Sequence, residues 1–186
     1  MNEDLLILSA LGSVVVGKLF IAWGLTPQKN RTGADGNLIF YGSVMQVNGN
    51  ALDAGFLRGE TPDKIGTQLQ VMAYIMSVYS FIVIQDQYAR IKIGLAVNLI
   101  LVLSEIIILS DRSIWNKNYL VIGNMIYAIG SLIHAMGKKN RLYSPSPLTT
   151  IDPLETKGAW VQAIGIIIIF SGTAAESTID SGNKQK

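Results

Sequence analysis

The chain has 186 residues, no cysteine and a formal net charge of +2, and charged residues make up only 15% of it. Soluble domains average roughly 25% charged residues, so this composition favours a lipid environment or a very apolar core. The basic residues are scattered, which excludes the concentrated basic surface of a nucleic-acid-binding protein. A chain without cysteine can form neither disulfides nor thiolate metal sites.

The first predicted helix is Leu5–Gly24, an apolar run that Lys18 interrupts. It follows Glu3 and Asp4, whereas a secretory signal peptide carries basic residues at that place. We therefore expect a retained helix and not a cleaved signal.

The second predicted helix, Asn37–Leu57, is far more polar than the other segments. An aspartate at the centre of a membrane span costs roughly 2.5–3.5 kcal/mol on insertion scales, and this segment carries Asp53. We expect it either to lie at a membrane interface or to be shielded by the other helices.

Four further segments are apolar and close to the ~20 residues that span a bilayer. They are Gly66–Gln85, Ile93–Ser110, Tyr119–Gly137 and Gly158–Ala175. The longest connection, residues 138–157, contains three prolines and is expected to be an extended loop. Ser110 or Asp111 is expected to cap the fifth helix. Residues 1–175 are thus predicted to form a single helical domain, and residues 176–186 a disordered tail.

A small residue recurs every seven positions along most of these segments, as in GNMIYAIGSLIHAMG. Seven residues is close to two helical turns, so the small residues share one narrow stripe of each helix. Glycine inside a helix costs about 1 kcal/mol relative to alanine, so its repeated use predicts close contact between helix backbones. The predicted packing seam comprises Gly17, Gly24, Gly42, Gly49, Gly66, Ala73, Gly123, Gly130, Gly137, Gly158, Gly165 and Gly172.

Polar residues share this stripe with the glycines. If the first small residue of each unit is position 0, positions 4, 7 and 11 fall within about 40° of it on a helical wheel. The polar residues at position 4 are Gln46, Gln70, Asn98, Tyr127 and Gln162. Position 11 adds Asp53, Ser77, Glu105 and His134. The acidic residues and the histidine of this set, Asp53, Glu105 and His134, form the candidate polar or ion-binding site.

The stripe has three interpretations. In the structural one, the glycines let the helices approach and the amide side chains hydrogen-bond between them. In the functional one, the stripe lines a hydrated cavity, where Asp53, Glu105 and His134 bind a cation or relay protons. In the third, glutamine and glycine simply face water on amphipathic helices, and the apolar helices form the core of a soluble bundle.

The stretch LIFYGSVMQVNGNALDAGFLRGETPDKIGTQLQVMAYIMSVYSFIVI resembles an uncharacterised repetitive family from Gram-positive bacteria. Members of that family repeat units of the form Gly-Asn-x-hydrophobic-Gln-Ala-hydrophobic-Gly, and GNMIYAIGSLIHAMG and GAWVQAIGIIIIFSG are similar to that unit. The fourth segment and the N-terminal segment match it poorly. The resemblance implies a repeated-helix architecture and transfers no activity and no functional residue.

These patterns predict an all-α protein, a bundle of about six apolar helices packed through glycine and small-residue heptad seams. We expect a non-enzymatic integral membrane or membrane-associated protein of the bacterial cell membrane, with a structural or permeability-related role. One alternative is a small channel or transporter that uses the polar seam. The other is a soluble, cytoplasmic helical interaction module.

The expected partner is the lipid bilayer, with a homo-oligomer as a further option and without nucleic acid. The chain has a single histidine and no cysteine, and it lacks the glycine-rich phosphate-binding patterns that follow a strand. We therefore predict no catalytic residue, no cofactor and no metal, and the sequence identifies no small-molecule substrate.

Overall fold

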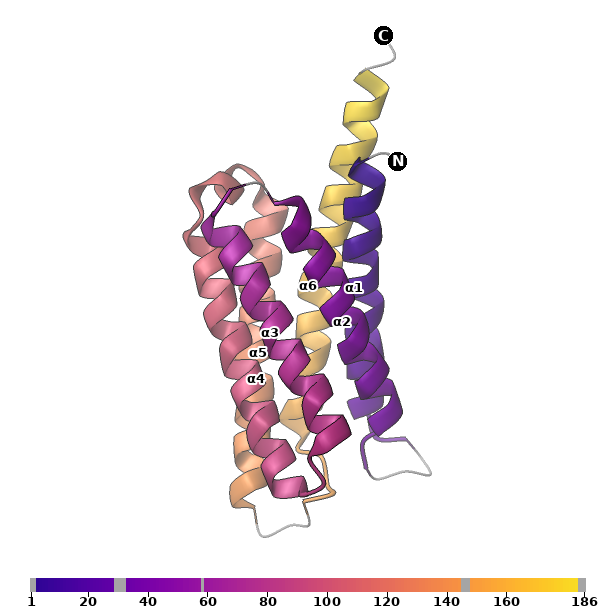
Figure 1. Cartoon of the computed structure of the whole chain (residues 1–186), viewed down its shortest axis with the longest axis vertical. Coiled ribbons are helices and arrows are strands. Elements are labelled where there is room, and N and C mark those ends of the chain that lie inside the picture. The colour runs from indigo at the N-terminus through magenta and orange to yellow at the C-terminus, as the bar shows by residue number, and fades with distance from the viewer. Residues whose placement is uncertain (1–2, 29–32, 58, 145–147, 184–186) are drawn as a thin grey trace.

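The computed structural model describes residues 3–28, 33–57, 59–144 and 148–183 (Figure 1). The described chain forms six α-helices and one short 3₁₀ helix. They are α1 (Glu3–Leu25), α2 (Gly36–Phe56), α3 (Pro62–Val83), α4 (Gln87–Ser110), η1 (Arg112–Asn116), α5 (Asn118–Tyr143) and α6 (Pro153–Asn183). The prediction of an all-α bundle of six helices is confirmed.

The helices run up and down in chain order and close into a ring (Figure 1). Each helix packs against its neighbours in the sequence, and α6 returns to pack against α1. The contacts are most extensive within the hairpins α1–α2, α3–α4 and α5–α6. The start of α1 and the end of α6 lie at the same end of the bundle, and the connections within the three hairpins lie at the other. The ring encloses an interior that all six helices can reach.

Capping side chains define where three of the helices begin. Asp35 caps α2, Thr61 caps α3 and Asp86 caps α4, and each accepts hydrogen bonds from backbone N–H groups of the first turn. Pro62 follows Thr61 at the first helical position, where its missing N–H costs nothing. These caps satisfy donors that the helix itself leaves unpaired.

The small residues of the predicted seam lie at the hairpin contacts. A β-carbon added at Gly17 would lie 2.7 Å from the Gly42 carbonyl oxygen, and one added at Gly66 would lie 2.7 Å from the Ser104 carbonyl oxygen. Ala73 is fully buried. Similarly close approaches to the neighbouring helix occur at Gly24, Gly42, Gly49, Gly123, Gly130, Gly137, Gly158, Gly165 and Gly172. Whether these contacts stabilise the bundle stays a prediction for substitution to test.

Helix boundaries differ from the prediction at both ends of α6. The expected loop 138–157 is shorter, because α5 continues to Tyr143 and α6 begins at Pro153. At its other end α6 stays helical to Asn183, into the segment predicted to be disordered, while residues 184–186 lie outside the described chain. There Glu176 accepts hydrogen bonds of 2.6 Å from both Lys117 and Tyr119, which ties the helix to the start of α5.

The capping prediction at the α4–α5 connection is also corrected. Asp111 caps η1 and not α5, since its carboxylate accepts a 2.9 Å hydrogen bond from the Ser113 backbone nitrogen. Lys117 precedes α5 and makes no side-chain capping bond. The intervening 3₁₀ helix is not predicted by the sequence pattern.

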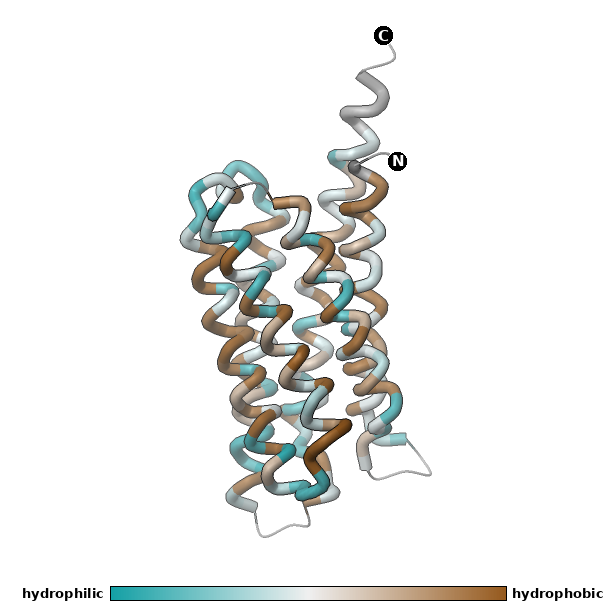
Figure 2. Tube along the Cα trace, in the orientation of Figure 1, coloured by the Kyte–Doolittle hydropathy of each residue, from teal (hydrophilic) through white to brown (hydrophobic). Residues whose placement is uncertain are grey.

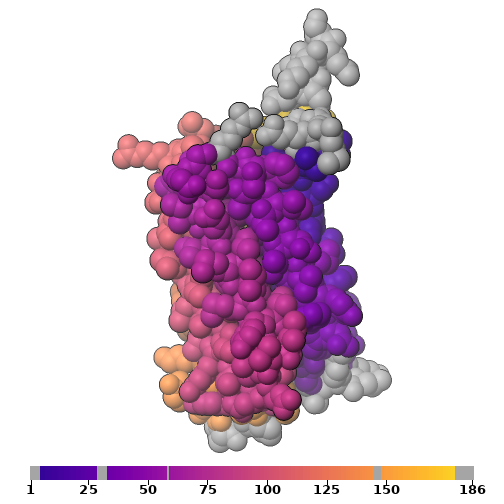
Figure 3. All heavy atoms as spheres, in the orientation of Figure 1, coloured from indigo at the N-terminus to yellow at the C-terminus, as the bar shows by residue number. Residues whose placement is uncertain are grey.

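Hydrophobic residues cover much of the length of the helices, and many hydrophilic ones gather at the connections (Figure 2). The space-filling view shows one face of the bundle as a column of closely packed side chains (Figure 3). Large apolar side chains on every α-helix are exposed, whereas the buried set includes lysine, glutamate, histidine and several amides. Beside its apolar core, the bundle therefore buries more charged and amide side chains, and exposes more large apolar ones, than a soluble domain ordinarily does.

Candidate functional site

A lysine lies at the centre of the polar interior. Lys18 of α1 is only 2% exposed, and its Nζ donates a 2.8 Å hydrogen bond to Oε1 of Gln162 on α6. The Gln162 amide nitrogen donates in turn to Ser131 Oγ at 2.7 Å and to Asn98 Oδ1 at 3.2 Å. These bonds join α1, α4, α5 and α6, and they provide the partners that a buried polar group requires.

Two tyrosine rings pack next to the ammonium group of Lys18. The hydroxyl groups of Tyr74 on α3 and Tyr127 on α5 lie 2.5 Å apart and share a hydrogen bond. Lys18 Nζ lies 5.0 Å from the Tyr74 ring centroid and 4.7 Å from that of Tyr127. Both distances suit a cation–π interaction, which is stronger where water is excluded.

Glu105 is the buried carboxylate nearest to this network. It is 1% exposed on α4, and its Oε1 accepts a 2.6 Å hydrogen bond from the Gln70 amide of α3. Its second oxygen has no hydrogen-bond partner among the described residues. Glu105 also attracts Lys18 electrostatically. This carboxylate therefore takes part both in a hydrogen bond between helices and in the charged interior.

His134 of α5 is 5% exposed and interacts electrostatically with Lys18. Neither nitrogen of its ring makes a hydrogen bond of acceptable geometry within the described residues, although the Gln162 side chain lies close. Asp53 is half-buried near the end of α2, where it interacts electrostatically with Asp63.

The three predicted site residues therefore do not share one site. Glu105 and His134 each interact with Lys18, whereas Asp53 lies toward the other end of the bundle. Within the described ranges, no group of three or more histidine and acidic side chains is placed to hold a metal ion. The polar residues at position 4 of the stripe are all buried, namely Gln46, Gln70, Asn98, Tyr127 and Gln162.

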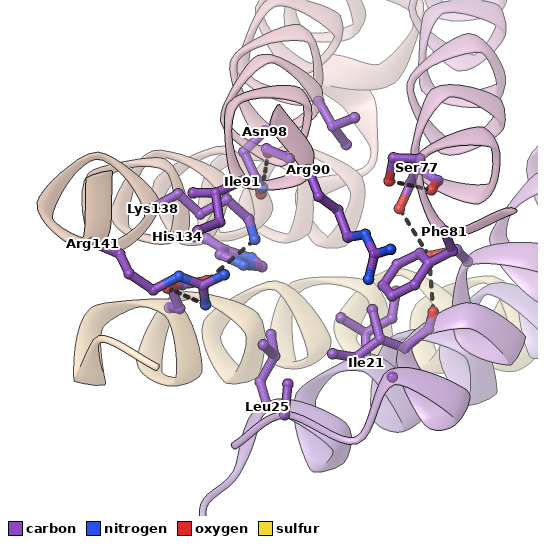
Figure 4. A pocket seen from close by; sticks show the side chains of 18 of the residues that line it. Ile21, Leu25, Ser77, Phe81, Arg90, Ile91, Asn98, His134, Lys138 and Arg141 are labelled. Carbon is purple, nitrogen blue, oxygen red and sulfur yellow. Dashed lines mark hydrogen bonds and ion pairs between the residues drawn. The ribbon is translucent and has the colours of Figure 1, made fainter. Parts of the chain in front are cut away.

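A cavity of about 300 Å³ extends from Lys18 to the end of the bundle where the hairpin connections lie. Figure 4 shows His134, Lys138 and Arg141 together on one side of it, and Arg90 reaching into it from α4. The remaining wall is largely apolar and includes Ile21, Leu25, Ile39, Phe81 and Ile91. The cavity combines a polar inner end with a basic and apolar outer part.

A buried ion-pair cluster forms part of the cavity wall. Glu155 of α6 is fully buried, and its carboxylate accepts hydrogen bonds from Lys138 Nζ at 3.2 Å and from Arg141 at 3.0 Å. On another wall, Arg90 donates from Nε to the Ile84 carbonyl at 3.2 Å. Its guanidinium carbon lies 5.6 Å from the Phe81 ring centroid.

The sequence patterns assign no role to Lys18, Arg90 or Glu155. For Lys18 a signal was present, because it is the one charged residue inside an otherwise apolar first segment. Arg90 and Glu155 lie next to connections, where charged residues are ordinarily solvated. Only the packing of the helices shows that they line a cavity.

A family model matches residues 6–170 of the chain, and its description is a family of unknown function, DUF6944. The chain belongs to this family. No curated protein and no solved structure matches it. Membership agrees with the predicted resemblance to an uncharacterised family, while the Gram-positive origin and the repeat unit stay predictions.

Proposed function

We propose that this protein is a non-enzymatic integral membrane protein of the bacterial cell membrane, in which six helices cross the bilayer together and the polar interior serves a permeability-related role. The observation that carries the proposal is the exposure of large apolar side chains on every helix, while lysine, glutamate and amide side chains are buried in the interior. Exposed apolar side chains on the six helices include Phe20, Leu52, Ile75, Leu103, Ile129 and Ile164. Monomeric soluble proteins rarely expose apolar surface of this extent, whereas lipid stabilises it.

Helix length supports the same proposal. Among the described residues, five helices are long and apolar enough to cross a membrane: Leu5–Leu25, Pro62–Val83, Gln87–Ser110, Asn118–Tyr143 and Pro153–Thr178. An α-helix rises about 1.5 Å per residue, so about 20 residues cover the ~30 Å hydrocarbon core. Each of these helices is therefore long enough to cross the bilayer with some tilt.

The polar helix α2 fits this arrangement because its two buried amide side chains donate hydrogen bonds inside the ring, although Oε1 of Gln46 accepts none within the described residues. The Gln46 amide donates to the Val14 carbonyl of α1, and the Asn50 amide donates to the Gln46 carbonyl at 2.9 Å. Gln46 is fully buried and Asn50 is 4% exposed. Polar groups inside a membrane are tolerated when they face the bundle interior and find partners there, so α2 can cross between α1 and α3.

The glycine seams support helix association in lipid. Apolar burial gives no driving force between helices there, so close van der Waals packing through small residues becomes the main attraction. Gly17 and Gly42 bring α1 and α2 together in this way, and Gly130 and Gly158 do the same for α5 and α6. Glycine seams are thus the packing device of the proposed membrane bundle.

The cavity favours a permeability-related role over a purely structural one. A packed seam of interhelical hydrogen bonds needs no open volume, yet about 300 Å³ lies between Lys18 and the end of the bundle. In a membrane this cavity would admit a polar solute from one side as far as the middle of the ring. The single histidine and the lack of cysteine offer little for nucleophilic chemistry, which supports a non-enzymatic role.

Fractionation of cells that express the full chain tests the proposal. We expect the protein to stay in the membrane pellet after an alkaline carbonate wash and to require detergent for extraction. A peripheral protein that carbonate releases serves as the control. Recovery of monodisperse protein from the soluble fraction without detergent would refute membrane integration and favour the soluble helical module.

A further inference from the structure

We propose that the cavity binds a small organic oxyanion, a carboxylate or a phosphate ester that carries an apolar group. This inference rests on the proposed function, because it names the class of solute that enters the cavity. The observations behind it are the charge of the lining, the unused hydrogen-bond donors in it and its apolar walls.

The lining is strongly biased toward basic side chains. Lys18, Arg90, Lys138 and Arg141 come from three different helices, and Glu155 is the one carboxylate among the described lining residues. Both Glu155 oxygens already accept hydrogen bonds from Arg141, and one of them also accepts from Lys138. Even if Glu105 behind Lys18 is counted, four basic groups face two carboxylates. An anion would restore the balance of charge, and a cation would worsen it.

Several donors around the cavity lack a full set of partners. Lys18 Nζ has three N–H groups, and the hydrogen bond to Gln162 uses one. Nε of Arg141 is a buried donor without a hydrogen-bond partner in the described chain, and so is the His134 ring, which carries one N–H when neutral. Buried unpaired donors are costly, and a bound oxyanion offers several acceptor lone pairs to groups of this kind.

The apolar wall determines the rest of the ligand. Ile21, Leu25, Ile39 and Ile91 face the same cavity, and Phe81 adds an aromatic surface. A fully hydrated inorganic ion would gain nothing from them, whereas an alkyl or aryl group gains about 25 cal/mol for each Å² of apolar surface that it buries. The ligand therefore combines an oxyanionic head with a short apolar body.

Three probes with one apolar body and different heads test this assignment directly. The full chain, purified in detergent, is titrated by calorimetry with hexanoate, hexanol and hexylammonium. We expect hexanoate to bind, hexanol to bind at least tenfold more weakly, and hexylammonium not to bind, since charge-assisted hydrogen bonds are about twice as strong as neutral ones. Equal binding of hexanoate and hexanol, binding of hexylammonium, or no binding of hexanoate would overturn the proposal.

Arg90→Gln and Lys92→Gln provide matched variants on α4. Arg90 lines the cavity, whereas Lys92 is exposed, does not line it and lies over the Tyr88 ring. We expect Arg90→Gln to weaken hexanoate binding roughly tenfold and Lys92→Gln to change it by less than about twofold. Lys18→Met should abolish hexanoate binding. If that variant does not fold, the comparison of Arg90→Gln with Lys92→Gln still tests the proposed site. Equal effects of the two glutamine substitutions would contradict a site in this cavity.

A lipid headgroup and a free solute carry the same oxyanion chemistry, and competition distinguishes them. Dihexanoyl phosphatidic acid and hexyl phosphate are compared as competitors of hexanoate. Higher affinity for the phosphatidic acid identifies a lipid headgroup as the ligand, and higher affinity for hexyl phosphate identifies a free solute. If hexanoate binds and neither phosphate displaces it, the ligand is a carboxylate and not a phosphate ester. If the protein stays in carbonate-washed membranes but does not bind hexanoate, the oxyanion proposal is refuted and membrane integration is retained. If the protein is soluble without detergent, membrane integration is refuted.

Discussion

The α5–α6 seam and the cavity beside it use the same two helices in opposite ways. At the seam, a β-carbon added to Gly130 would lie 2.6 Å from the Gln162 backbone nitrogen, so there is no room for a side chain. In the interior, the Gln162 side chain extends away from that contact to reach Lys18, Ser131 and Asn98. One stripe thus supplies both close packing and polar groups that face the interior. The predictions below separate these two contributions.

The largest effect is expected where the seam and the cavity meet, at Glu155. Replacing it with Gln would remove the only ionic partner that the structure gives Lys138 and Arg141 in the described chain. Breaking a buried pair by removing one partner typically costs about 3–5 kcal/mol. Unfolding of the detergent-solubilised protein by denaturant measures this loss. The matched control is Glu60→Gln, at a largely exposed carboxylate whose pair with Lys64 is 3.7 Å long, and it should change stability by less than about 1 kcal/mol. Equal effects at the two sites would contradict a stabilising role for the cluster.

Gly130→Ala tests the seam alone. The added methyl group would collide with the α6 backbone, and overpacking of this kind costs about 1–3 kcal/mol. Gly55 of α2 is the control, because a β-carbon there meets nothing within 4 Å. Gly55→Ala should instead stabilise the protein by up to about 1 kcal/mol through helix propensity. Changes of the same sign in thermal unfolding would show that the glycine stripe is not a packing device.

Glu105→Gln tests the polar interior without altering shape. The amide can still accept the hydrogen bond from Gln70, and Lys18 keeps Gln162 and the two tyrosine rings as partners. We expect the free energy of unfolding to stay within about 1 kcal/mol of the wild type, since the substitution also removes the desolvation cost of a carboxylate whose second oxygen has no hydrogen-bond partner in the described chain. A loss of several kcal/mol would mean that the Glu105–Lys18 pair holds the bundle together.

The smallest effect is expected at Asp111, outside the proposed membrane spans. Hydrogen bonds from the Ser113 backbone and hydroxyl groups lower the pKa of this carboxyl below its usual range. A lowered pKa in the folded state stabilises the protein above the unfolded pKa near 4, and this contribution disappears as the pH falls through the folded pKa. Asp111→Asn should therefore cost about 0.5–1 kcal/mol at neutral pH and nothing at the acid end of a pH series. A cost that does not change with pH would exclude the carboxylate charge as its cause.

Much of the bundle could be predicted from the sequence because its helices share one period. The seven-residue repeat identified the stripe of glycines, and position 4 of that stripe predicted buried polar residues such as Gln162 and Asn98. The stripe leaves height along the bundle open, so it could not tell whether Asp53 lies beside Glu105 and His134; the structure places Asp53 near the end of α2.

The cavity itself could not be predicted. Lys18 follows Gly17, which belongs to the stripe. One residue corresponds to a rotation of about 100° around the helix, so the Lys18 side chain points away from the seam and toward the interior. That direction becomes the interior only because α6 closes the ring against α1. Arg141 and Glu155 were placed in a predicted loop, and their ion pair exists only because both helices extend into that segment. Long-range closure, and not local pattern, creates the site.

Spin labels on α3 test most directly whether the bundle has a lipid-facing outside and a water-accessible cavity. The chain has no cysteine, so Ile75→Cys and Ser77→Cys each provide a single labelling site. Ile75 is 52% exposed on the outer surface, and Ser77 lines the cavity two residues along the same helix. In liposomes, we predict that oxygen, which partitions into lipid, relaxes the label at residue 75 more strongly, and that a water-soluble nickel complex relaxes the label at residue 77. Equal access of the nickel complex to both labels, or preferential access to residue 75, would contradict the account.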